Sequence, residues 1–413
     1  MLKKISVSSL RSGMFLQALD CSWFDHPFWK KSFLLCDEDI KKIVASGIQA
    51  VVIDTDKGVT SDIAADGLGH LFTISVPVAD QSSDPLPAEP SSAQECQPRK
   101  SVAEEIQHAK RLFVSASGQM KLVFQQARMG KAVSSLAMMP LVEAISASVI
   151  RNPHALTSVA RLKRHDSYTY MHSVAVCALM TALACELELD EQTIREAGAA
   201  GLMHDIGKAL MRPDVLNKPG KLTAEEMEIA RMHPEDGWRL LQSANVSAGV
   251  LQVALHHHEK FDGSGYPHEL KGENIPLLAR MGAVCDVYDA VTSERPYKAA
   301  WQPAEALRSM ASWDGHFEKS IFSAFVKCIG IYPVGTLVRL ESGHLAVVLD
   351  QNRGAVSAPV VKKFFSIRSK QPVLPEILNL EKANRLDQIV QVEDPKNWNF
   401  PYLADLWLNQ GPS

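Results

Sequence analysis

The stretch Gly201-Leu202-Met203-His204-Asp205-Ile206-Gly207-Lys208 decides how the rest of the chain is interpreted. It places an imidazole and a carboxylate side by side in an otherwise apolar segment, with a lysine one turn later. Adjacent residues of a helix do not face each other, so the two side chains do not simply form a pair. A divalent metal ion lying against the helix would bind both. We therefore expect this stretch to begin a metal site whose other ligands lie elsewhere in the chain.

Further histidine and aspartate residues with apolar neighbours lie on both sides of this stretch. The complete candidate set is His172, His204, Asp205, His233, His257, His258 and Asp286. Imidazole and carboxylate ligands without thiolate suit Fe, Mn, Zn, Co or Ni. Because a structural zinc ion takes only four ligands, this set indicates two metals that share one carboxylate, Asp205. We assign to the first metal His172, His204 and Asp286, and to the second His233, His257 and His258.

Each of these residues has a simpler explanation when it is taken singly. A lone histidine on an apolar helix is more often a hydrogen-bonded core residue, and residues 256–258 would also suit a solvated turn at a helix end. Only the number of these residues and their shared apolar setting favour a metal site.

Two further segments carry groups that suit a phosphate ligand. A glycine-rich loop at 261–267 contains Gly265 and Tyr266 and directly follows the paired histidines. Two cations, Arg295 and Lys298, come just after the predicted helix of Asp286. Alone, the loop would be an ordinary turn and the cations would be a favourable helix C-terminus. Beside a metal site they would form a phosphate clamp, since arginine binds phosphate through two parallel hydrogen bonds.

Composition and charge restrict the other possibilities. The chain has 413 residues and a formal net charge of −4, which argues against general binding to DNA or to an anionic membrane. Its longest apolar run, 174–185, is too short to span a bilayer and indicates a buried helix. The seven cysteines are dispersed without a C-x-x-C pair, and the N-terminus has no apolar signal core. We expect a cytoplasmic protein with neither a disulfide framework nor a thiolate zinc site.

The pattern of apolar and polar residues predicts a mainly α protein with two smaller regions that contain β-strands. A small α+β domain covers 1–78, with strands at 51–54 and 72–76 and a helix at 37–46. Its aromatic cluster at 23–29 would be either a satellite core or a docking surface. This domain is followed by a Pro/Ser-rich linker (79–100), a helical connector (101–150), a helical catalytic domain (151–331) and a C-terminal region (332–413). Ser101 and Glu104 form a capping-box pattern that predicts the start of the first connector helix. The C-terminal region begins with a β-hairpin from strands at 334–340 and 344–350, and residues 360–366 are the candidate for an additional strand.

The order and spacing of these elements resemble the HD-GYP family of bacterial HD-superfamily phosphodiesterases. The matching elements are His172, His204-Asp205-x-Gly-Lys208, His233-Pro234-x-x-Gly237, His257-His258-Glu259-x-x-Asp262-Gly263-x-Gly265-Tyr266-Pro267, Asp286-x-x-Asp289-Ala290 and Arg295-Pro296-Tyr297-Lys298. The resemblance covers about residues 150–330 and implies an all-helical HD-type metallohydrolase bundle. It also implies hydrolysis of cyclic di-GMP to pGpG and then to GMP, by a hydroxide that bridges two metals. The N-terminal segment resembles a domain of unassigned function that often precedes HD-GYP domains.

The same resemblance suggests roles for individual residues. It implies that Lys208 orients the phosphate or protonates the departing 3′-oxygen, and that Arg295 and Lys298 neutralise charge on the phosphoryl group. Tyr266 would pack on a guanine or support its loop, Gly265 would border the pocket, and Asp166 matches a polar position near the substrate.

For the metals, the resemblance suggests two Fe or Mn ions, with Ni, Co or Zn as alternatives. Some family members hold a third metal through a Glu one turn before the first histidine, a position that Tyr168 occupies here. A phenol is a poor ligand at neutral pH, so we expect two metals at this site.

Two other functions stay open at this point. In the first alternative, the substrate is another cyclic dinucleotide, such as cyclic GMP-AMP. Nothing in the sequence determines which nucleobases the substrate carries. Alternatively, the protein would be a regulatory scaffold that binds GGDEF-domain partners. Degenerate scaffolds of this kind usually lose a ligand or the Gly-Tyr-Pro loop, and this chain keeps all seven ligands, Lys208 and the loop.

Overall fold

The structure is a computed structural model that describes residues 2–19, 33–45, 50–57, 100–161, 168–218, 220–293, 300–352, 355–382 and 387–408. It divides the chain into two compact units, Met1–Gln97 and Pro98–Ser413. The division falls inside the predicted linker at 79–100, most of which lies outside the described residues. The domain boundaries that the sequence suggests stay predictions.

The first unit contains an antiparallel sheet and a helix, α1 (Asp37–Ala45). The strands follow the order β1 (Leu2–Ser6), β4 (Ala50–Asp54), β2 (Phe15–Leu19) and β3 (Phe33–Leu34). Ile43 of the helix packs with Leu16 and Ile53 of the sheet in one buried core. The predicted helix at 37–46 and strand at 51–54 are confirmed. The predicted strand at 72–76 and the aromatic cluster at 23–29 lie outside the described residues.

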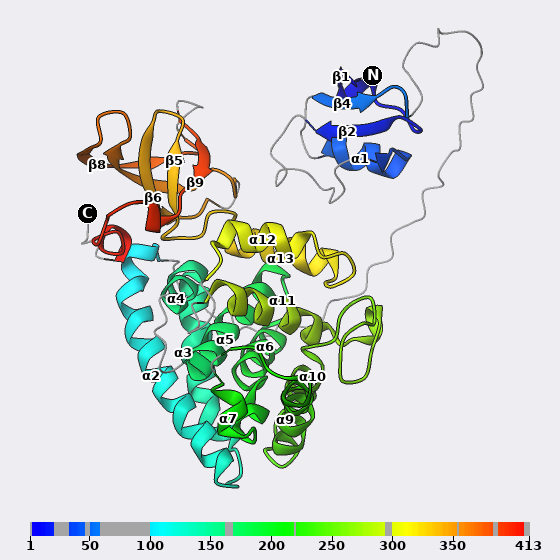
Figure 1. Cartoon of the computed structure of the whole chain (residues 1–413), viewed down its shortest axis with the longest axis vertical. Helices are drawn as coiled ribbons and strands as arrows, with labels where there is room; N and C mark the ends of the chain where they lie inside the picture. Colours follow the sequence, from blue (N-terminus) through cyan, green and yellow to red (C-terminus); the bar gives the residue numbers. More distant parts are fainter. Residues whose placement is uncertain are drawn as a thin grey trace, which may run out of the picture. The chain divides into compact units, whose positions relative to one another are not determined.

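The second unit is a helical bundle built around α5 (Tyr168–Glu186), as Figure 1 shows. This helix packs against α2 (Val102–Arg128), α3 (Ser135–Arg151), α4 (Pro153–Ala160), α6 (Glu191–Met203), α11 (Leu277–Thr292) and α13 (Lys319–Ile329). Every side chain from 172 to 184 is buried. The segment Thr169–Glu186 is long and apolar enough to cross a membrane, but 72% of it is buried inside the protein. It is therefore a core helix, as the sequence predicts.

Short elements complete the bundle around the helices already named. They are η3 (Ile206–Ala209), α7 (Pro213–Leu216), α8 (Ala224–Arg231), α9 (His233–Gln242), α10 (Ala248–His256), η4 (Gly272–Asn274) and α12 (Pro303–Ala311). The predicted start of α2 is confirmed, since the side chains of Ser101 and Glu104 each accept a hydrogen bond from the other's backbone N–H. Thr223 and Glu226 form the same arrangement at the start of α8.

Close packing of α5 and α6 brings two predicted ligands together. A Cβ atom on Gly201 would lie 2.8 Å from the carbonyl oxygen of Val176 and 2.9 Å from Cα of Cys177. Any side chain at Gly201 would therefore push the two helices apart. Because His172 belongs to α5 and His204 caps α6, this glycine controls the distance between their imidazoles.

The C-terminal region forms a five-stranded antiparallel sheet, larger than the predicted hairpin. Its strand order is β8 (Gln371–Asn379), β7 (Val360–Ser366), β6 (His344–Asp350), β5 (Leu337–Leu340) and β9 (Ile389–Val392). The predicted hairpin is confirmed, with Leu337 opposite Val347, as is the strand at 360–366. The tail also adds α14 (Asp405–Leu408), where the Leu408 carbonyl accepts a hydrogen bond of 2.9 Å from Gln107 of α2.

Candidate metal centre

Five segments of the bundle bring the seven predicted ligands to one place. His172 lies on α5, His204 and Asp205 follow α6, and His233 is the first residue of α9. His257 and His258 follow α10, and Asp286 lies in the middle of α11. Six of these residues are buried, and the side chain of His258 is 23% exposed.

Gly207 explains why the turn after Asp205 can approach α9. A Cβ atom on this glycine would lie 2.0 Å from the carbonyl oxygen of His233 and 2.5 Å from the backbone nitrogen of Gly237. Both neighbours are backbone atoms of α9, so a side chain at this position would displace the helix itself. The glycine therefore sets the distance between His233 and Asp205.

The two carboxylate oxygens of Asp205 face two different groups of imidazoles. Oδ2 lies 3.3 Å from Nε2 of His204 and 3.5 Å from Nε2 of His172. Oδ1 lies 3.3 Å from Nε2 of His233 and 3.7 Å from Nε2 of His257. Asp205 thus occupies the position between the groups that a bridging ligand requires.

Each side of Asp205 is completed by further donor atoms. On one side, Asp286 Oδ1 lies 2.9 Å from Nε2 of His172 and 3.8 Å from Nε2 of His204. On the other side, Nε2 of His233 lies 3.3 Å from that of His257 and 3.2 Å from that of His258. Neighbouring ligands bound to one ion at about 2.1 Å lie roughly 3.0–3.4 Å apart, which most of these distances approach.

Hydrogen bonds at the far side of the rings fix the tautomers. Nδ1 of His204 lies 2.8 Å from the carbonyl of Gly201, and Nδ1 of His233 lies 2.6 Å from that of Ala230. Nδ1 of His257 bonds in the same way to the carbonyl of Val253 at 2.9 Å. A carbonyl oxygen only accepts, so Nδ1 carries the proton and a neutral ring turns its Nε2 lone pair toward the centre.

The protonation states also suit a metal site. Burial and the neighbouring His233 lower the pKa of His258 to about 3, so its imidazole is neutral at pH 7. Burial raises the pKa of the Asp205 carboxyl, but the nearby Lys208 and His204 hold this pKa well below its usual value. Burial alone would lower the pKa of His204, yet Asp205 and Asp286 raise it to about 10. The carboxylates therefore favour a positive charge at this point, which a metal cation would supply.

Two buried polar atoms identify the place where a cation fits. Nε2 of His204 and Oδ1 of Asp205 have no hydrogen-bond partner among the described residues, although both side chains are only 1% exposed. Lone pairs of neighbouring imidazoles that face each other repel unless a cation lies between them. The donor groups His172, His204, Asp286 and His233, His257, His258 each have ligand atoms within 4.8 Å of one another. The residues therefore fit divalent metal binding, without identifying the metal.

The remaining predicted site residues fall into two groups. Lys208 places Nζ 2.5 Å from Oδ2 of Asp205, and the Tyr266 ring stacks on His258 at a centroid distance of 4.8 Å. Gly265 lies against the turn after α10, where a Cβ atom would be 2.3 Å from the backbone nitrogen of Lys260. The other group lies outside the described residues: Asp166, Arg295, Lys298 and the side chain of Tyr168.

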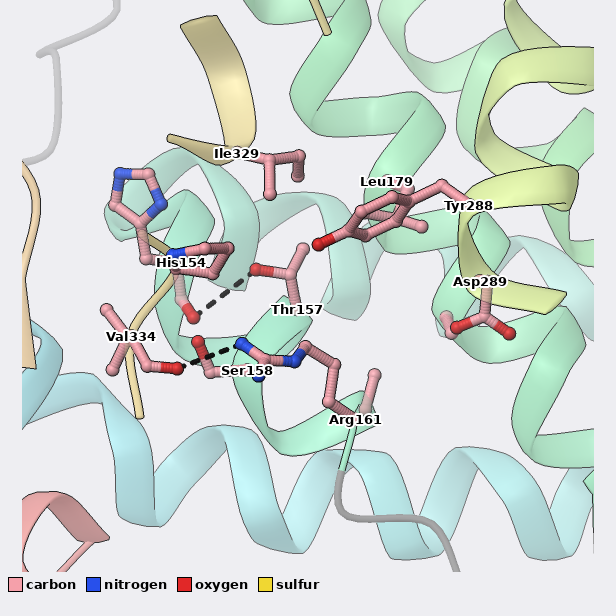
Figure 2. Close-up of a pocket in the computed structure, with 12 residues that line it drawn as sticks. His154, Thr157, Ser158, Arg161, Leu179, Tyr288, Asp289, Ile329 and Val334 are labelled. Carbon is pink, nitrogen blue, oxygen red and sulfur yellow. Dashed lines mark hydrogen bonds between the residues drawn. The ribbon is translucent and has the colours of Figure 1, made fainter. Parts of the chain in front are cut away.

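Asp289 is a buried site residue to which the sequence analysis gave no role. Its Oδ2 lies 2.6 Å from Nδ1 of His172 and so orients that imidazole, as carboxylates behind metal-bound histidines do. The signal was its position three residues after Asp286, on the same helix. Asp289 also lines the small pocket of Figure 2, into which the hydroxyl group of Tyr288 points. Arg161 lines the same pocket and donates a hydrogen bond of 3.1 Å to the carbonyl of Val334.

Arg231 and Glu259 also have positions that the sequence analysis did not predict. The guanidinium of Arg231 lies 5.4 Å from the centroid of the Tyr266 ring, which adds a cation beside the metal ligands. The buried carboxylate of Glu259 accepts backbone hydrogen bonds from His268 at 2.7 Å and Leu270 at 3.1 Å. It thereby holds the segment that follows the Gly-Tyr-Pro loop.

Comparison with known proteins agrees with this geometry. The HD domain family matches residues 148–321, and a domain of unknown function, DUF3391, matches residues 2–137. The second match extends beyond the predicted boundary at 78, through the linker and into α3. A cyclic di-GMP phosphodiesterase of Pseudomonas aeruginosa is 50% identical over 416 residues, which cover 100% of this chain and 97% of the relative.

Two further relatives each match part of the chain. The cyclic di-GMP phosphodiesterase response regulator RpfG of Xanthomonas campestris is 48% identical over 161 residues, covering 38% of this chain and 42% of the relative. A 3′3′-cGAMP-specific phosphodiesterase of Vibrio cholerae is 35% identical over 164 residues, covering 39% of this chain and 38% of the relative. With a relative of this identity over its whole length and the ligand pattern in place, the chain belongs to the HD-GYP family of HD-domain phosphodiesterases.

Proposed function

We propose that this protein is a metal-dependent phosphodiesterase that hydrolyses cyclic di-GMP to linear pGpG and then to GMP. The observation that carries the proposal is the position of Asp205, whose two oxygens face two separate groups of imidazoles. A relative that is 50% identical along the whole chain and is named for this activity supports the choice of substrate.

The proposed ligands follow the two groups of donor atoms. One divalent metal would be held by His172, His204 and Asp286, the other by His233, His257 and His258, and both by Asp205. Bound divalent cations supply Lewis acidity, which lowers the pKa of water and withdraws charge from a phosphodiester. We infer Fe or Mn as the metals, with Ni, Co or Zn as alternatives.

The chain's own residues would bind and orient the phosphodiester. Lys208 holds a positive charge 2.5 Å from Asp205 and is 26% exposed, so it can reach both the centre and a bound phosphate. It would attract the phosphate and protonate the departing 3′-oxygen. Tyr266 and Arg231 would form a wall beside His258, offering an aromatic face and a guanidinium to a guanine base or a phosphate. Asp166, Arg295 and Lys298 stay predicted substrate contacts.

The experiment measures metal and activity on the same sample of full-length protein. Protein purified without oxygen is analysed for bound metals by mass spectrometry, and cyclic di-GMP cleavage is followed by chromatography. We expect the His204→Ala, Asp205→Ala double variant to lose the metals of the binuclear centre and hydrolysis together. Hydrolysis at the wild-type rate by this variant would falsify the proposed site.

Substrate choice is decided in the same assay by competition. We expect cyclic di-GMP to be cleaved in preference to 3′3′-cGAMP, the dinucleotide for which one Vibrio cholerae relative is named. The reverse order of kcat/KM would assign the chain to the second substrate while leaving the metal site unchanged. Binding of GGDEF-domain partners and a cytoplasmic location also stay predictions.

A further inference from the structure

A second cluster of metal-binding side chains lies outside the seven proposed ligands. It consists of His256 at the end of α10, Glu259 in the following turn and His268 in the segment after the Gly-Tyr-Pro loop. One donor atom from each residue lies within 4.8 Å of the other two. The three donor atoms therefore lie close to the spacing of one coordination sphere.

The imidazole of His256 presents an unpartnered ring nitrogen within this cluster. The residue is 6% exposed, and its Nδ1 atom has no hydrogen-bond partner among the described residues. Oε1 of Glu259 lies 3.7 Å away, which is too long for a hydrogen bond. Leaving a buried polar atom without a partner is unfavourable. A ligand bound to Nδ1 of His256 would remove that unfavourable contribution.

Glu259 supplies the negative charge and positions the third residue. Its side chain is fully buried, and no described lysine or arginine forms an ion pair with it. The two backbone hydrogen bonds that it accepts hold His268 beside His256, with ring centroids 5.2 Å apart. A carboxylate has about four lone-pair positions, so it can accept these bonds and still bind a cation.

We propose that His256, Glu259 and His268 bind a divalent transition metal, with Zn²⁺ as the best match, at a site separate from the binuclear centre. Two imidazoles and one carboxylate are an established donor set for zinc, with further positions left to water. Ligands bound at about 2.1 Å in a tetrahedral site lie about 3.4 Å apart. The observed 3.7 Å between His256 and Glu259 thus needs only a small closure. His268 is exposed and gives the ion an entry from solvent.

Metal at this site would attach the loop to α10. His268 comes two residues after Tyr266, whose ring packs on His258 of the proposed centre. An ion held by His268 and His256 would therefore restrict the wall that Tyr266 and Arg231 form beside His258. The binding of this ion does not depend on which substrate the protein hydrolyses.

The test counts metal ions. Full-length protein is stripped with a chelator, incubated with Zn²⁺, desalted and analysed for zinc per chain. We expect His268→Ala to contain about one zinc ion fewer than wild type. His108→Ala, which removes a half-exposed histidine of α2 outside the cluster, should match wild type. Equal zinc content in wild type and His268→Ala overturns the proposal.

A second pair of proteins separates this site from the binuclear centre. In the His204→Ala, Asp205→Ala background, the cluster should still bind zinc, and adding His268→Ala should lower the zinc content by about one ion per chain. Equal zinc content in the double and triple variants contradicts the proposal. If this background does not fold, the comparison of His268→Ala with wild type decides alone. Because zinc content is read without substrate, failure here is distinct from failure of the proposed phosphodiesterase activity.

Discussion

Replacing Gly207 by alanine should disassemble half of the metal centre. The added Cβ atom would lie 2.0 Å from the carbonyl oxygen of His233 and 2.5 Å from the nitrogen of Gly237. Ordinary van der Waals contact requires about 3.4 Å or more, so α9 must move by about 1 Å or more. His233 begins that helix, and its Nε2 atom now lies 3.3 Å from Oδ1 of Asp205. A misplacement of about 1 Å in a catalytic site costs on the order of 100-fold in rate.

The assay compares Gly207→Ala with a matched substitution at Gly118. A Cβ atom on Gly118 in α2 would meet nothing within 4 Å, so the alanine there should stabilise the helix by roughly 1 kcal/mol without altering the site. We expect Gly207→Ala to lose metal and at least about 100-fold in kcat/KM, while Gly118→Ala keeps both. Circular dichroism shows whether each variant is folded. A folded Gly207→Ala with full metal content and wild-type activity refutes the reasoning.

Three further predictions concern the surroundings of the metals. Asp289→Asn removes the charge behind His172 and should weaken metal binding or activity by about 10–100-fold. The control variant Tyr288→Phe, in the same pocket, should leave the metal content unchanged. Equal metal titrations for the two variants would contradict the role of Asp289 in orienting His172. Lys208→Met should keep the metals but lower kcat by about 100-fold, because the cation 2.5 Å from Asp205 is lost; an unchanged kcat removes Lys208 from the chemistry. Removing the metals with a chelator should lower the melting temperature. Metal bound at a free concentration about 1,000-fold above Kd adds about 4 kcal/mol to the free energy of unfolding. An unchanged melting temperature would show that the metal ligands do not link the helices.

The sequence predicted the bundle because its signals are local. The apolar run at 174–185 reads as a helix that is hydrophobic on all sides, and α5 is buried through 172–184. The capping box at Ser101 and Glu104 marked the start of α2 for the same reason, since both hydrogen bonds form within one turn.

Contacts between distant segments could not be obtained in this way. The pairing of His172 with Asp289 joins α5 to α11, and only the packing of these helices brings the two atoms to 2.6 Å. The cation beside Tyr266 is another example, because Arg231 lies on α8 and the ring follows α10. The strands β8 and β9 were not predicted because apolar and polar residues alternate only weakly in the tail. Since β8 is mostly exposed, packing imposes little such pattern on its sequence.

Gly265→Ala should affect substrate binding rather than metal content. A Cβ atom there would lie 2.3 Å from the nitrogen of Lys260 and 2.5 Å from Cα of Glu259. The loop that contains Gly265 should move, rather than the turn at Glu259 and Lys260. That turn follows α10, which is held in place by buried residues such as Val253. Tyr266 would then leave its stacked position on His258, raising KM by about 10-fold for the loss of roughly 1.4 kcal/mol of contact. Metal analysis and steady-state kinetics on one preparation distinguish the cases. Lost metal would show that the loop and the ligands form one unit, whereas an unchanged KM would show that Tyr266 does not face the substrate.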